Sequence, residues 1–67
     1  MSSLELKAPK GKFRVIGVDT FSSEDWIYDD LDTLNGAIEL ANQKGAEMLK
    51  THVYDENGKH MHSGGNF

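Results

Sequence analysis

The sequence contains no cysteine and only one proline among its 67 residues. Without cysteine there is no disulfide framework, no thiolate nucleophile and no sulfur ligand for a metal ion. No apolar run approaches the roughly 20 residues that a bilayer crossing needs. Residues 1–12 also lack the apolar centre of a secretory signal. We therefore expect a cytoplasmic protein that does not enter a membrane.

Basic residues are few and unevenly placed, and the formal net charge is −4. Four bases lie within residues 1–14, whereas residues 15–32 contain six acids and no base. An acidic domain repels a phosphate backbone at long range, so the charge argues against nucleic-acid binding. With 37% hydrophobic and 27% charged residues, the composition is typical of one small, acidic, folded domain.

The hydrophobic pattern predicts two hairpins of short strands. The four expected strands lie at residues 12–19, 26–28, 47–54 and 59–63. Turn-forming residues separate the first strand from the second and the third from the fourth, so each pair is expected to be antiparallel.

A helix is predicted between the two hairpins, over residues 33–44. Apolar residues at i, i+3, i+4 and i+7 line one face of it, namely Leu34, Ala37, Ile38 and Ala41. Thr33 or Asp32 can cap its first turn with a side-chain oxygen. Gly45 is placed to end the helix in the left-handed conformation.

The chain is expected to divide into an irregular leader at 1–11, one ββαββ domain at 12–63 and a frayed tail at 64–67. Leu4 and Leu6 lie two residues apart and allow a short additional edge strand in the leader. Phe67 is expected to be either loose or packed back onto the sheet.

This order predicts an α+β fold, a four-stranded, mainly antiparallel sheet with one helix packed on one face. The order of elements resembles that of protein G-like β-grasp domains. A second resemblance, over residues 13–58, is to short uncharacterised prokaryotic ββαβ(β) proteins with a strand like FRVIGVDTF, a helix that begins with DT and a VYD-x-x-G hairpin. Neither resemblance implies an activity.

One helix covers only one face of such a sheet, so the other face should be exposed. The expected core pairs Leu34, Ile38 and Ala41 with Ile16, Val18, Ile27, Leu49, Val53 and Met61. The opposite strand positions hold Phe13, Val15, Trp26, Tyr28 and Tyr54. Two interpretations remain open, namely rings that only stabilise strand pairing and a surface for self-association or for a partner. In the second interpretation the partner-binding residues are Phe13, Trp26, Tyr28 and Tyr54.

All three histidines, His52, His60 and His62, belong to the last hairpin. A type I turn with a left-handed Gly58 would set His52 opposite His62 and gather the three imidazoles on one face. A two-residue turn at Asn57-Gly58 would separate His52 from His62 instead. Gathered imidazoles can bind zinc, nickel or copper, whereas the simpler interpretation is half-exposed histidines without a ligand.

No motif in the sequence predicts catalysis. The acidic segment at 30–41 lacks the spacing of a calcium loop, Lys10-Gly11-Lys12 is no phosphate loop, and no nucleophile elbow occurs. We expect a non-enzymatic protein-interaction or self-association module without a cofactor, with a protein partner or a second copy bound at an aromatic sheet face or an edge strand. The alternative is a metal- or small-ligand-responsive domain that uses the three histidines.

Overall fold

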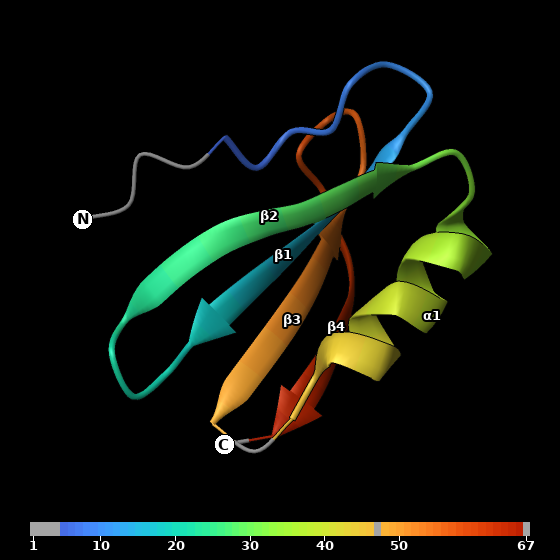
Figure 1. The fold of residues 1–67 in the computed structure, drawn as a ribbon. Coiled ribbons are helices and arrows are strands. Elements are labelled where there is room, and N and C mark those ends of the chain that lie inside the picture. The colour runs from blue at the N-terminus through green and yellow to red at the C-terminus, as the bar shows by residue number, and fades with distance from the viewer. Residues whose placement is uncertain (1–4, 47, 67) are drawn as a thin grey trace.

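A computed structural model describes residues 5–46 and 48–66 (Figure 1). Its elements are β1 (Phe13–Asp19), β2 (Glu24–Leu31), α1 (Leu34–Lys44), β3 (Leu49–Tyr54) and β4 (His60–Asn66). The strand order is β2-β1-β3-β4, and all neighbouring strands are antiparallel. With α1 against one face, the predicted ββαββ, α+β fold is confirmed. The described part of the chain contains no helix of the length and apolarity required to span a membrane.

Two strands extend beyond their predicted bounds. β2 begins at Glu24 and continues to Leu31, because β1 offers pairing partners along its whole length. β4 continues to Asn66, and Gly64 and Gly65 pair with residues of β3. The expected frayed tail is therefore wrong for residues 64–66. The predictions for Leu4 and Phe67 concern positions outside the described residues.

The helix begins as predicted and ends differently. Thr33 is the N-cap, and its hydroxyl accepts a hydrogen bond of 3.1 Å from the Gly36 amide. Gly45 has φ −64° and ψ 138°, an extended conformation, so the expected left-handed cap is wrong. The Gly45 amide still donates to the carbonyl of Ala41 at 2.9 Å, which satisfies one terminal helix carbonyl.

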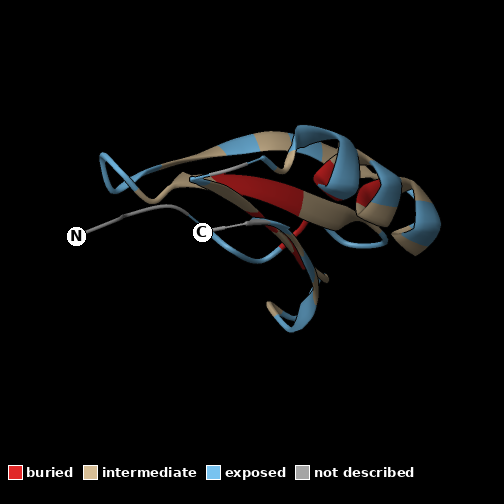
Figure 2. Cartoon of the chain, turned by 90° about the horizontal axis from the view of Figure 1, so that it is seen from below, coloured by how far each residue is buried: buried red, intermediate tan, exposed pale blue. Residues whose placement is uncertain are grey.

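The core lies between α1 and the middle of the sheet (Figure 2). Its fully buried members are Val15, Ala37, Ala41 and Val53. Half-buried apolar residues that pack around them are Phe13, Tyr28, Leu31, Leu34 and Leu40. The two alanines bring the helix backbone close to the sheet, where the Thr51 hydroxyl donates to the Ala41 carbonyl at 2.8 Å.

The predicted orientation of the first two strands is wrong. Val15 and Tyr28 pack beneath the helix, so Ile16, the neighbour of Val15, lies on the other face. Val18 and Ile27 share that other face with Ile16, since Ile27 is its register partner. Of the expected strand core, Val53 is fully buried and Met61 is 36% exposed. Alternation along β1 determines which residues share a face of the sheet. Because the residues on both faces of β1 are largely apolar, the sequence pattern does not show which face lies under α1.

The leader covers part of the face away from α1 (Figure 2). Arg14 Nη1 donates to the Glu5 carbonyl at 2.8 Å, and the Ala8 amide donates to the Asp55 carbonyl at 3.1 Å. Ala8 is buried, and Ile16 is only 1% exposed although it faces away from the helix. The sheet is thus covered on both sides, by α1 on one and by residues 5–12 over part of the other.

Candidate functional site

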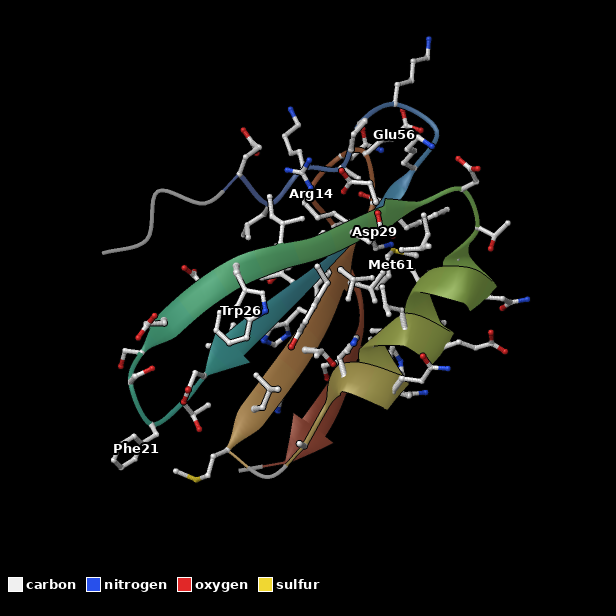
Figure 3. The ribbon with its side chains drawn as sticks, viewed as in Figure 1. Arg14, Phe21, Trp26, Asp29, Glu56 and Met61 are labelled. Atoms are coloured by element: carbon white, nitrogen blue, oxygen red, sulfur yellow. The ribbon has the colours of Figure 1, made fainter. Side chains whose placement is uncertain are left out.

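The helix leaves one part of its own sheet face uncovered. α1 packs mainly against β4, β1 and β3 and touches β2 least (Figure 1). Trp26, on β2, therefore remains half-buried on the part of this face that α1 does not reach (Figure 3). Its indole meets the Tyr28 ring edge to face, with ring centroids 5.8 Å apart and planes at 81°.

Gly17 explains how the two rings find space on this face. It is the register partner of Trp26 on β1 and lacks a side chain. A Cβ atom at Gly17 would lie 2.5 Å from Tyr28 Cε2 and 2.7 Å from Trp26 Nε1. Lys44 Nζ lies 5.9 Å from the centroid of the Tyr28 ring, within the range of a cation–π contact. Tyr28 is thus fixed between Trp26 and the end of the helix.

Two exposed apolar side chains lie at the same end of the sheet. Phe21, in the β1–β2 turn, is 84% exposed, and Met48, before β3, is 41% exposed. Their segments are joined, because the amide and the hydroxyl of Thr20 both donate to the Met48 carbonyl at 3.0 Å. Leu49, the half-buried residue after Met48, pairs with Asp19 at this same end. We call the set of Phe21, Trp26, Tyr28, Met48 and Leu49 the Trp26 surface. It presents apolar groups of the kind that mark interaction sites.

The structure separates the four predicted partner-binding residues. Phe13 and Tyr28 pack against the core, Trp26 is half-buried on the helix side, and Tyr54 lies on the opposite face. The expected single face with four exposed rings is therefore wrong, because β1 and β2 turn their aromatic positions toward α1. Sequence reasoning missed Phe21, for which the available signal was a large apolar residue among turn-forming ones.

β2 is an edge strand with an acidic composition. It pairs with β1 on one side and forms one end of the sheet. A bulge at Tyr28 interrupts the register, and the Asp30 amide donates to Asp29 Oδ1 at 2.8 Å. The regular part of this edge is therefore Glu24–Ile27, next to the Trp26 surface.

The other face of the sheet carries a cluster of His52, Tyr54 and His60. His52 Nδ1 and His60 Nε2 are 3.2 Å apart, and their ring centroids are 5.2 Å apart. The Tyr54 ring lies beside both, with centroid separations of 6.2 Å to His52 and 5.4 Å to His60. Burial of the His52 ring lowers its pKa, and the charges of His60 and Lys50 act in the same direction.

His62 does not join this cluster. The turn is the first of the two alternatives left open by the sequence, with Gly58 at φ 79° and the Asp55 amide donating to the Lys59 carbonyl at 3.0 Å. Met61 is then left unpaired, so His62 rather than Met61 opposes Val53. His62 Nε2 lies 3.0 Å from Asn42 Oδ1 of the helix. The expected gathering of three imidazoles is wrong.

The bulge at Met61 has a packing reason at Gly64. A Cβ at Gly64 would lie 2.8 Å from Thr51 Oγ1 and 3.0 Å from the Ala41 carbonyl oxygen. A regular ladder would bring Ser63 to this position, where its Cβ has no room. The extra residue therefore keeps a glycine under the helix.

Across residues 5–46 and 48–66, no group of three or more histidine or acidic side chains is arranged to hold a metal ion.

Arg14 and Asp30 form a bidentate ion pair on the face away from α1. Arg14 Nε lies 2.8 Å from Asp30 Oδ1, and Nη2 lies 3.1 Å from Oδ2. The hydrogen bond to Asp30 raises the pKa of Arg14. Because Nη1 donates to the Glu5 carbonyl, the guanidinium joins the sheet to the leader and serves the fold.

Comparisons of this chain with protein-family models, with curated proteins and with solved structures give no match. The function is therefore inferred from the two surfaces described above, the Trp26 surface with the β2 edge and the histidine pair.

Proposed function

We propose that this protein is a non-enzymatic, cytoplasmic interaction module that binds an extended, basic segment of another protein along β2. The observation that supports the proposal is the position of Trp26. A half-buried indole stands on an edge strand, on the part of the sheet face that α1 contacts least, and exposed Phe21 and Met48 lie at the end of the sheet where β1 turns into β2. Tryptophan is among the residues that most often anchor protein interfaces.

The backbone of β2 supplies the second element of the proposal. An edge strand presents alternate amide and carbonyl groups that a partner strand can bind. The regular segment Glu24–Ile27 offers such groups beside the Trp26 side chain. Side chains of the added strand would then reach the Trp26 surface at every second residue.

Charge favours a basic partner over a second copy. Glu24 is exposed, and Asp25 and Asp29 lie on the same strand. Two β2 edges from identical chains would bring these carboxylates together, which opposes pairing. Lysine or arginine side chains on a partner strand would be attracted instead. The same acids protect the edge from unselective association.

A displayed library of random eight-residue peptides tests the proposal, with binding measured by the fluorescence of Trp26, the only tryptophan. We expect enriched peptides to alternate basic and apolar residues and to bind less tightly as salt increases. Trp26→Ala should weaken the binding of a labelled peptide at least tenfold.

Two exposed glutamates provide a matched pair of charge reversals. Glu24→Lys, on the β2 edge, should weaken binding severalfold, whereas Glu39→Lys, on α1, should leave it unchanged. Enriched peptides without basic residues, or equal binding by the Trp26→Ala variant, would contradict the proposal. Dimerisation at micromolar concentration that Trp26→Ala abolishes would also overturn it, since the occupant would then be a second copy.

A further inference from the structure

We propose that His52 and His60 form a two-histidine chelate for a transition-metal dication that prefers imidazole, with copper(II) bound most tightly. The site lies on the face away from α1 and is separate from the Trp26 surface. It uses side chains from two adjacent strands, β3 and β4. Imidazole nitrogen is a good ligand for copper, nickel and zinc.

The distance between the two ring nitrogens supports the chelate. His52 Nδ1 and His60 Nε2 are 3.2 Å apart. Two nitrogen ligands about 2.0–2.1 Å from one cation are about 2.9 Å apart at a right angle and about 3.3 Å apart at the tetrahedral angle. The observed separation lies between these values, so the two nitrogens already lie at chelating distance, and each ring has to turn its lone pair from the other nitrogen toward a shared cation.

Neighbouring groups hold the two rings near this arrangement. Tyr54 is the register partner of His60, and its ring contacts both imidazoles. His52 is half-buried, which restricts its rotamers, whereas His60 is exposed and accessible to solvent. The His52 ring is thus more restricted than the His60 ring, and the exposed side of His60 leaves room for water or another ligand in the remaining coordination positions.

The proton balance of binding is simple when both rings are neutral. In the free protein, one of the two facing nitrogens carries the hydrogen of the shared hydrogen bond. A cation needs the lone pairs of both nitrogens. The ring that donates must therefore shift its proton to its other nitrogen, and no proton is lost.

Titration of the intact chain with copper(II) chloride, followed by calorimetry and by nuclear magnetic resonance, tests the site. We expect one saturable site and paramagnetic loss of the His52 and His60 ring signals. Zinc should compete for the same site with lower affinity. Magnesium, which prefers oxygen ligands, should not compete.

Single substitutions to glutamine separate this pair from the third histidine. His52→Gln and His60→Gln should each reduce copper affinity at least tenfold, whereas His62→Gln should leave it unchanged. Circular dichroism confirms that each variant is folded. Signal loss centred on His62, or equal affinity in all three variants, would overturn the proposal. Trp26→Ala should bind copper with unchanged affinity, because Trp26 lies on the other face of the sheet. Loss of peptide binding and loss of copper binding therefore test the two proposals separately.

Discussion

The two faces of the sheet bury their side chains by different means. On one face, Val15 and Val53 are fully buried against the alanines of α1. On the other, Ile16 is only 1% exposed although no helix covers it, and this face also carries the leader, which Arg14 and Asp55 hold in place. Cover by α1 or by the leader, rather than strand composition, therefore decides which positions are exposed. Both candidate functional surfaces lie where neither α1 nor the leader gives full cover.

Matched valine deletions on β1 test this difference most strongly. Val15 is fully buried under α1, and Val18 is half-buried on the opposite face of the same strand. Val15→Ala removes two buried carbons and leaves a cavity, so we expect a loss of about 2–3 kcal/mol in unfolding free energy. Val18→Ala should cost less than about 1 kcal/mol. Chemical denaturation measures both, and equal losses would show that α1 adds nothing to the burial of this strand.

Gly17→Ala tests the uncovered part of the helix face. The new Cβ would meet Tyr28 and Trp26, whose rings must move away from β1. We expect a loss of about 1–2 kcal/mol from overpacking and a red shift of Trp26 fluorescence as the indole becomes more exposed. An unchanged emission spectrum would mean that Trp26 does not rest over Gly17.

Arg14→Gln tests the cover of the other face. The variant loses the bidentate contact with Asp30 and the bond to the Glu5 carbonyl. We expect a loss of about 1 kcal/mol and faster hydrogen exchange at the Ala8 amide, which reports the docked leader. Lys12→Gln is the control, since Lys12 pairs with Asp32 at an exposed site and should contribute little. Unchanged hydrogen exchange at the Ala8 amide would show that docking of the leader does not depend on Arg14.

Thr51→Val gives the smallest expected effect, at the contact of β3 with the helix end. The buried hydroxyl donates to the Ala41 carbonyl, which also accepts from the Gly45 amide. Since this carbonyl keeps one partner, we expect a loss of about 0.5–1 kcal/mol. Thr20→Val removes a similar bond at an exposed site and should cost less in the same denaturation experiment. A larger loss of unfolding free energy for Thr20→Val than for Thr51→Val would contradict the expectation that the buried hydrogen bond contributes more than the exposed one.

The sequence was sufficient to predict the elements and one helix cap. Strand composition, apolar spacing and Thr33 all act locally, and local patterns identify them. The orientation of β1 was not predictable in this way, because Val15 and Ile16 are both apolar and occupy opposite faces. Gly17 contributes to this orientation physically, since its missing side chain leaves room on its face for the Trp26 and Tyr28 rings.

The histidine cluster was predictable only in part. The turn around Gly58 is one of the two that the sequence left open, and it brings His52 and His60 to one face. The position of His62 depends on Gly64, two residues further along β4, and on the helix backbone above it. The close approach of Gly64 to Thr51 and to the Ala41 carbonyl joins residues far apart in the chain, so a local sequence pattern cannot predict it.

The docked leader also sets an order of events during synthesis. The Gly11 amide donates to Glu56 Oε1, a side chain 45 residues further along the chain. The Ala8 amide likewise needs the carbonyl of Asp55. While the ribosome extends the chain, the first hairpin can form early, but the leader has no binding place until the turn after β3 has emerged. Attachment of the leader therefore follows the emergence of this turn, and the Ala8 and Gly11 amides report when it has taken place.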